Sequence, residues 1–138
     1  MPREIFINLP VKNLDRSIKF FKELGFEFNP QFTDKNAACM IIEENIFAML
    51  LTEEFFKTFL SPNKQIADPQ KNTEVLLCVS ADSRKEVDDI VAKAKAAGAS
   101  SPRDPQDHGF MYGHGFDDLD GHIWEVMYMD MNAMKNLS

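Results

Sequence analysis

One acidic residue is a candidate for chemistry because it lies in an otherwise apolar segment. Glu125 falls within the run His122 to Met129, and the alternation of a strand puts Trp124 and Val126 on the opposite face. The Trp124 face suits a core, which leaves Glu125 to face a cleft. A carboxylate between apolar neighbours beside a cleft is a candidate functional group, although a charge on a wet sheet face would give the same pattern.

Other groups that could contact a ligand lie in two places along the chain. His108 and His114 lie in or beside a segment broken by glycines, which could cover a cleft, and Tyr112 could present its hydroxyl there. A lone loop histidine is usually solvated, and core packing accounts for the tyrosine equally well. Glu74 follows Asn72-Thr73 at the start of a strand, where a solvated carboxylate is the favoured interpretation.

The cysteines and the net charge exclude several functional classes. Cys39 and Cys78 lie in apolar runs without metal or redox spacing, so two buried free thiols in a reducing cytoplasm are expected. The net charge of -7, without a run of basic residues, argues against nucleic acid and against an anionic membrane surface. No apolar stretch is long enough to span a bilayer, and no signal-peptide pattern is present. A cytoplasmic protein that binds a small molecule is therefore expected.

The hydrophobic periodicity predicts the order strand, helix and three further strands, twice. The first set is expected as strands over 5–11, 26–32, 37–42 and 46–52, with a helix capped by Asn13 or Asp15 and ended by Gly25. A short helix over 53–60 follows. The second set is expected as strands over 74–80, near 99–101, over 110–116 and over 122–129, with a helix capped by Asp82 or Ser83. Asp120-Gly121 predicts the last hairpin turn.

This doubled pattern predicts one α+β domain over residues 1–138. Module one is expected at about 1–60, a connector at 61–72 and module two at about 73–130. Each βαβββ module should form a curved mixed sheet with its helix on the convex side. Pairing the two sheets would leave their concave faces around a small-molecule cleft.

Two stretches at opposite ends of the chain resemble one superfamily. The first runs from Leu9-Pro10-Val11-Lys12-Asn13-Leu14-Asp15-Arg16-Ser17 through Phe20-Phe21 to Leu24-Gly25-Phe26, and the second is Asp118-Leu119-Asp120-Gly121-His122-Ile123-Trp124-Glu125-Val126. They are similar to the opening and to the last hairpin of vicinal oxygen chelate proteins. That superfamily includes glyoxalase I, bleomycin-resistance proteins and extradiol dioxygenases. The branch of predicted lactoylglutathione lyases looks closest.

The resemblance implies a cleft that, in many members, holds a divalent metal. The metal chelates two substrate oxygens as a Lewis acid, and a carboxylate moves a proton beside a carbonyl. Carried over by position, Glu125 is the last-strand ligand and catalytic carboxylate, and Glu74 is a second ligand. The first-strand position falls on Phe6, with Asn8 one step further, and the fourth-strand position falls near Leu50. Two carboxylates would make a weak magnesium- or manganese-like site; the identity of the metal stays open, and a cleft without metal is an alternative.

Two main functions follow from this resemblance. One is a metal-dependent lyase, isomerase or dioxygenase acting on a small oxygenated molecule at a degenerate metal site. The other is a binding or antibiotic-resistance protein that sequesters an aromatic or cationic compound without turnover. A subunit or regulator with a degenerated cleft is a weaker third reading, and a homodimer is expected by resemblance. The residues expected to line the pocket are Phe6, Asn8, Leu50, Tyr112 and His114.

Overall fold

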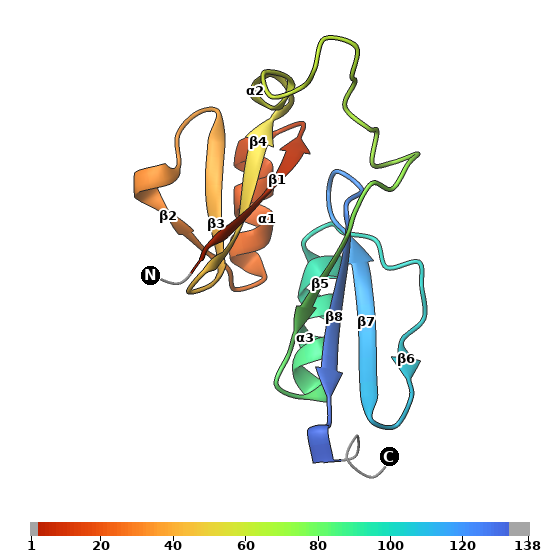
Figure 1. The fold of residues 1–138 in the computed structure, drawn as a ribbon. Helices are drawn as coiled ribbons and strands as arrows, with labels where there is room; N and C mark the ends of the chain where they lie inside the picture. The colour runs from red at the N-terminus through yellow and green to blue at the C-terminus, as the bar shows by residue number, and fades with distance from the viewer. Residues whose placement is uncertain (1–2, 133–138) are drawn as a thin grey trace. The chain divides into compact units, whose positions relative to one another are not determined.

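A computed structural model describes residues 3–132, and the chain divides into two compact units, one ending at Ala67 and one beginning at Asp68. Within the described residues each unit builds a four-stranded mixed sheet, and a helix lies against one face of that sheet (Figure 1). The predicted α+β class and the doubled strand–helix–strand pattern are confirmed. No helix within residues 3–132 combines the length and the apolar character that crossing a membrane requires.

The first unit places its first strand beside its last. Its sheet has the order β1-β4-β3-β2, with β1 and β4 parallel and the other pairs antiparallel. Its elements are β1 (Ile5–Val11), α1 (Leu14–Glu23), β2 (Glu27–Asn29), the 3-10 turn η1 (Pro30–Phe32), β3 (Ala37–Glu43), β4 (Ile46–Thr52) and α2 (Glu53–Lys57).

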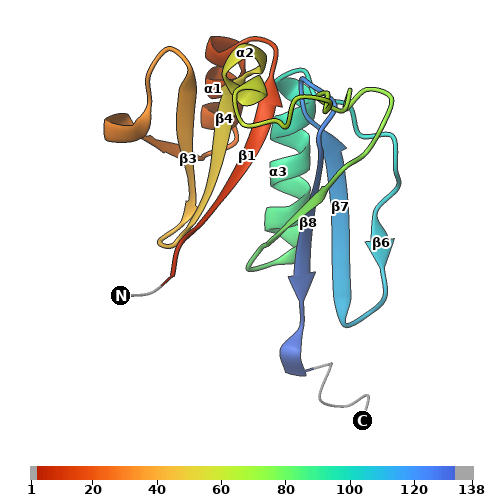
Figure 2. The same cartoon turned by 45° about the horizontal axis from the view of Figure 1, so that its top comes forward.

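The second unit repeats this topology. Its sheet has the order β5-β8-β7-β6, again with the first pair parallel and the others antiparallel. Figure 2 shows β7 and β8 side by side in this sheet. Its elements are β5 (Leu76–Ser80), α3 (Arg84–Ala96), β6 (Gln106–Asp107), β7 (Met111–Asp117) and β8 (Ile123–Met129).

Both long helices begin at a side-chain cap and end before a glycine. The Asn13 side chain accepts a hydrogen bond from the Arg16 N–H at 3.1 Å, and the Ser83 hydroxyl accepts one from the Glu86 N–H at 3.0 Å. Of the alternatives in the sequence, Asn13 and Ser83 are therefore the caps. Glycines with φ of 103° and 109° follow the two helices at positions 25 and 98, where a side chain would be strained.

Several predicted elements are shorter in the structure. The strand expected over 26–32 stops at Asn29, because the Asn29 side chain accepts the Gln31 N–H at 2.9 Å and caps a turn that opens with Pro30. The strand expected near 99–101 is a single bridge between Ser100 and Asp117. The strand expected from residue 74 begins at Leu76 instead.

Each sheet has one closed face and one more open face. In the first unit the register neighbours Leu9, Leu50 and Ala38 are at most 2 % exposed and form the closed face. In the second unit Trp124 and Val126 are 1 % exposed and pack on the α3 side. The two outer faces carry Phe6 in the first unit and Glu125 in the second, as strand alternation predicts.

The turn between β7 and β8 is held by one buried carboxylate. Asp118 Oδ1 accepts the main-chain N–H groups of Asp120, Gly121 and His122 at 3.0, 3.1 and 3.0 Å. Asp118 Oδ2 accepts the indole N–H of Trp124 at 2.9 Å. The predicted Asp-Gly hairpin is thus present, and Asp118 also fixes Trp124 toward the core. Because side chains alternate along β8, this orientation fixes Glu125 on the other face.

Candidate functional site

The open face of the second sheet is organised around Glu125 in the middle of β8. The strand register places Cys78 of β5 on one side of it and Gly115 of β7 on the other. Asp117 lies two residues further along β7, on the same face. This face therefore carries two carboxylates, one thiol and a glycine at neighbouring positions.

Arg103 joins the two carboxylates. Its Nη2 donates to Asp117 Oδ1 at 2.9 Å, and its Nε lies 3.4 Å from Glu125 Oε1. The three side chains are 39 %, 26 % and 36 % exposed, in the order Arg103, Asp117 and Glu125. Within residues 3–132 the buried Nε atom has no hydrogen-bond partner, so its contact with Glu125 is an ion pair without hydrogen-bond geometry. Arg103 neutralises part of the charge of this face.

Gly115 leaves the space that the Glu125 carboxylate occupies. A Cβ at this position would lie 2.7 Å from Glu125 Oε2 and 2.6 Å from the main-chain oxygen of Trp124. No side chain fits at such distances. The absence of a side chain at position 115 therefore lets Glu125 lie across β7 toward Arg103.

His114 holds the main chain of the Arg103 segment. Its Nε2 lies 3.0 Å from the Arg103 carbonyl oxygen and 3.1 Å from the Ser101 hydroxyl. The Ser101 hydroxyl donates its own hydrogen to the Gly115 carbonyl at 2.7 Å, so both neighbours of Nε2 can only accept. The network therefore assigns the proton of a neutral His114 to Nε2.

Cys78 is exposed, whereas the sequence predicted a buried thiol. The reason is its place on β5, an edge strand of the second sheet, on the open face. Partial burial of the sulfur raises the pKa of the Cys78 thiol, and the negative charge of Glu125 raises it further. A thiol with a raised pKa is mostly protonated and is a poor nucleophile. Cys39, by contrast, is buried as expected.

Glu74, the second predicted metal ligand, lies away from Glu125. It is exposed and precedes β5 by two residues. The partner of Glu125 in the register is Cys78, four residues further along, which corresponds to roughly 13 Å of extended chain. The structure therefore does not bring these two carboxylates together.

Phe6 and Asn8 lie on the open face of the first sheet. The Phe6 ring is 45 % exposed and stacks on Phe47, with 4.8 Å between ring centroids and 12° between planes. Asn8 donates from Nδ2 to the Phe6 carbonyl oxygen at 3.3 Å. Leu50 was predicted beside them, but it lies on the opposite face and has no exposed surface. The register places Met49 next to Asn8 instead.

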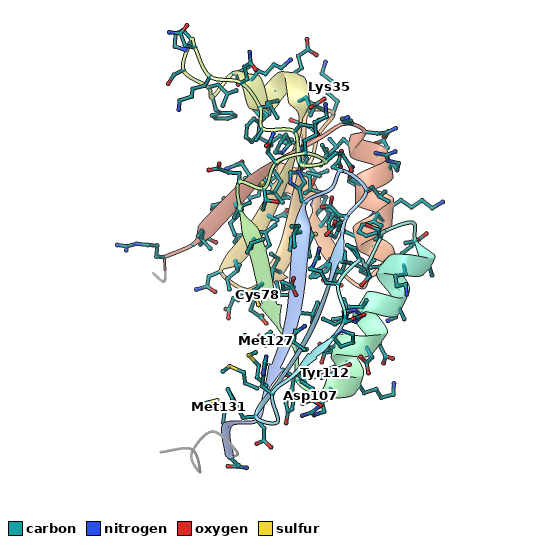
Figure 3. The ribbon with its side chains drawn as sticks, turned by 90° about the vertical axis from the view of Figure 1, so that its right-hand side faces the viewer. Lys35, Cys78, Asp107, Tyr112, Met127 and Met131 are labelled. Atoms are coloured by element: carbon teal, nitrogen blue, oxygen red, sulfur yellow. The ribbon has the colours of Figure 1, made fainter. Side chains whose placement is uncertain are left out.

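Tyr112 and His114 lie on the α3 face of the second sheet, opposite to Glu125. Tyr112 donates its hydroxyl to Asp88 at 2.6 Å, and that hydrogen bond raises the pKa of the phenol. Arg84 stacks its guanidinium 5.1 Å from the Tyr112 ring centroid and binds Asp107 through two hydrogen bonds of 2.8 and 3.1 Å. These contacts fasten β6 to α3, and Figure 3 shows Tyr112 and Asp107 toward α3, with Cys78 away from it. The structure thus separates these two predicted pocket residues from Glu125.

The side chains at the expected ligand positions do not fit a divalent metal. Glu125 is already paired with a guanidinium, and the first-strand position carries the aromatic ring of Phe6. Within residues 3–132, no three side chains of the His, Cys, Asp or Glu type come together as a metal-binding group. The predicted metal ligands Glu125 and Glu74 therefore lack the partners that such a site needs.

Sequence reasoning missed Arg103, which comes from a loop without hydrophobic periodicity. A glycine facing Glu125 across the hairpin was the available signal, because it indicates space reserved for that side chain. The role of Asp118 in holding the β7–β8 turn was indicated in the sequence only by its place in the Asp-Leu-Asp-Gly stretch.

Comparison with known proteins supports one fold. A family model described as bleomycin resistance protein-like N-terminal matches residues 3–42. A hypothetical protein from S. aureus is 29 % identical, with a TM-score of 0.76 over 93 % of this chain and 95 % of that chain. A glyoxalase/bleomycin resistance protein/dioxygenase family enzyme from Burkholderia phytofirmans is 16 % identical, with a TM-score of 0.77 over 90 % and 96 %.

A third similar structure is that of a protein named for antibiotic resistance. The genomically encoded fosfomycin resistance protein FosX from Listeria monocytogenes is 20 % identical, with a TM-score of 0.64 over 93 % of this chain and 91 % of that chain. A search of curated proteins finds no match. The predicted superfamily is thus supported by sequence at the N-terminus and by the fold across both units.

Proposed function

We propose that this chain, which resembles vicinal oxygen chelate proteins in its fold and in its N-terminal sequence, binds a small molecule and sequesters it without a bound metal. The ligand class is a planar, largely apolar compound that carries a basic group. The observation that carries this proposal is the stacking of Phe6 on Phe47. Phe6 occupies the first-strand position at which the resemblance leads us to expect a metal-coordinating residue.

The Phe6–Phe47 pair offers a flat apolar surface. The two rings are nearly parallel, and Phe6 leaves almost half of its surface uncovered on the open face of the first sheet. Aromatic ligands gain from offset stacking on such a ring in addition to the burial of apolar area. A phenylalanine has no atom that coordinates a metal ion, so this position serves apolar contact.

The net charge of the chain supports a basic group on the ligand. The whole chain has a net charge of -7, and a field of this sign attracts cations. The proposal therefore favours cationic over anionic aromatic compounds.

The names of similar proteins agree with a protective role. The matching N-terminal model is described as bleomycin resistance protein-like, and FosX is named a fosfomycin resistance protein. A role in resistance to a toxic compound is part of the proposal for this chain.

A metal-dependent lyase, isomerase or dioxygenase is the second candidate. The observation that favours it is the position of Glu125, which stands in the middle of the last strand on the open face. For this candidate Glu125 would have to separate from Arg103 before it could act on a substrate.

Ligand titration tests the binding proposal. Acridine orange serves as a planar cation, anthracene-2-sulfonate as a planar anion and spermidine as a non-planar cation, each titrated by calorimetry. We expect binding of acridine orange only, and a loss of at least tenfold in Phe6→Ala, which corresponds to about 1.4 kcal/mol. The matched control is Phe32→Ala, because Phe32 is 61 % exposed on η1 and should leave the affinity unchanged. Equal losses in both variants, or no binding by the wild type, would refute the proposal.

Elemental analysis and a turnover assay test the second candidate. The protein is purified without an affinity tag, its Ni, Zn, Fe, Mn and Mg are measured, and the hemithioacetal of methylglyoxal and glutathione is offered as substrate. Stoichiometric metal that disappears in Glu125→Gln, together with turnover, would favour the enzyme over the sequestering protein.

A further inference from the structure

We infer that Arg103 serves as an internal cation on the open face of the second sheet. Its guanidinium occupies the place where a bound cation would pair with Glu125 and Asp117. The inference concerns a face discussed under the proposed function, but it does not depend on which ligand the protein binds. It assigns to one loop residue the control over whether this face accepts an external cation.

The positions of the two carboxylates create the need for a cation. Glu125 lies opposite Gly115, and Asp117 is two residues further along the same strand, so the two acids are diagonal neighbours on one face of adjacent strands. Diagonal neighbours on one sheet face are within reach of each other, and two like charges there repel unless a cation lies between them. Arg103 meets both, at 2.9 Å from Asp117 Oδ1 and 3.4 Å from Glu125 Oε1.

Neighbouring residues hold the Arg103 guanidinium and the Glu125 carboxylate close to each other. Gly115 gives the Glu125 carboxylate its space over β7. His114 and Ser101 fasten the loop that carries Arg103, through the Arg103 carbonyl and the Gly115 carbonyl. Besides the Arg103–Asp117 pair, residues 101 and 103 make three hydrogen-bond contacts to β7, two with the His114 ring and one with the Gly115 carbonyl. The arrangement is therefore a built site for one internal cation.

The Nε atom of Arg103 is buried, although the side chain as a whole is 39 % exposed. Within the described residues this atom makes no hydrogen bond. A buried donor without an acceptor costs free energy, so this position of the side chain is retained against a penalty. The attraction to two carboxylates offsets that penalty, and removal of the guanidinium would leave both acids without their cation.

Two consequences follow for the binding of cations. With Arg103 in place, its guanidinium repels divalent ions and pairs with both carboxylates, so these ions bind weakly. Without it, the carboxylates form a small anionic pocket with the shape of the missing side chain. A free alkylguanidinium ion then matches the vacated position, and a hard divalent ion such as Mn²⁺ finds two oxygen ligands.

The experiment compares wild type with Arg103→Ala by thermal unfolding and calorimetry. Millimolar ethylguanidinium chloride should raise the unfolding temperature of Arg103→Ala above that in matched sodium chloride, and should leave the wild type unchanged. Mn²⁺ should bind Arg103→Ala at least tenfold more tightly than wild type. Both gains should disappear in the double variant Arg103→Ala/Glu125→Gln.

Controls separate this inference from general effects of charge. Arg16→Ala removes an arginine from an exposed position of α1 and should show neither gain. If Arg103→Ala does not fold, Arg103→Gln keeps the Cβ–Cγ–Cδ stem and a polar end without the charge, and the Mn²⁺ comparison is made with that variant. Wild-type protein that binds Mn²⁺ through Glu125, or an Arg103 variant that responds like wild type, would overturn the inference. These readouts use neither Phe6 nor an aromatic ligand, so they fail or succeed independently of the proposed function.

Discussion

Gly115 and Glu125 face each other across the β7–β8 hairpin, and the glycine provides the space in which the carboxylate lies. An added Cβ at position 115 would approach Glu125 Oε2 to 2.7 Å. The carboxylate therefore lies over the neighbouring strand, where it reaches Arg103. The identity of one residue thus determines where the charge of another lies.

Gly115→Ala should disturb both the strand pair and the ion pair. The new methyl group would also meet the Trp124 main-chain oxygen at 2.6 Å, and overpacking of this kind costs about 1–3 kcal/mol. Chemical unfolding followed by the fluorescence of Trp124, the one tryptophan of the chain, measures the loss. Gly113→Ala is the matched control, because its Cβ would lie at an ordinary 3.5 Å from the Val126 oxygen. Equal stability of the two variants would contradict this account of Gly115.

Asp118→Asn should destabilise the second unit although the two side chains have nearly the same shape. Asp118 accepts four hydrogen bonds, one of them from the Trp124 indole at 2.9 Å. An asparagine has one oxygen and one amide nitrogen, so a donor would face another donor, and an unsatisfied buried group costs about 1–3 kcal/mol. The unfolding midpoint in urea measures the effect. Asp104→Asn, at an exposed loop position, should leave the midpoint unchanged.

The Arg84–Asp107 pair predicts that the free energy of unfolding decreases at low pH. Hydrogen bonds from Arg84, and then from the Gly109 N–H, lower the pKa of Asp107 from 3.8 to about 2. Because the pKa is depressed in the folded state, the stabilisation is complete above pH 3.8 and is lost as the pH falls through 2. A carboxyl ¹³C titration should therefore give a midpoint for Asp107 near 2.

Arg84→Gln tests the cause of that depressed pKa. The midpoint of Asp107 should rise toward 3.8 but stay below it, since the Gly109 N–H still donates to Asp107 at 3.0 Å. Lys85→Gln is the control, because Lys85 pairs with Asp89 at 2.7 Å and does not contact Asp107. A midpoint that does not move in Arg84→Gln would show that the arginine is not the cause.

The local patterns that were predicted correctly are those that depend on near neighbours in the chain. Alternation along β8 separates Trp124 from Glu125, and that separation is what the structure shows. The caps Asn13 and Ser83 act on residues three positions ahead. Such interactions can be inferred from sequence because they are set within one turn or one strand.

Register and loop paths could not be inferred in the same way. A shift of one residue moves a side chain to the other face of a strand, which is why Met49 rather than Leu50 lies beside Asn8. Arg103 reaches Glu125 only because its loop runs along the outer edge of β7 after the Ser100–Asp117 bridge. The exposure of Cys78 depends on β5 being an edge strand, and the order of strands is a property of the whole sheet.

His114 should act as a positioning residue for Arg103, and two substitutions distinguish this role from simple packing. Its single Nε2–H is shared between the Arg103 carbonyl oxygen and the Ser101 hydroxyl oxygen. His114→Phe keeps an aromatic ring but removes the donor, so a loss of about 1 kcal/mol is expected, with faster amide hydrogen exchange over residues 101–103. His114→Gln can place an amide N–H near the same point and should restore most of the protection. If phenylalanine and glutamine gave the same exchange rates, the ring volume rather than the donated hydrogen bond would hold the loop, and the positioning role would be wrong.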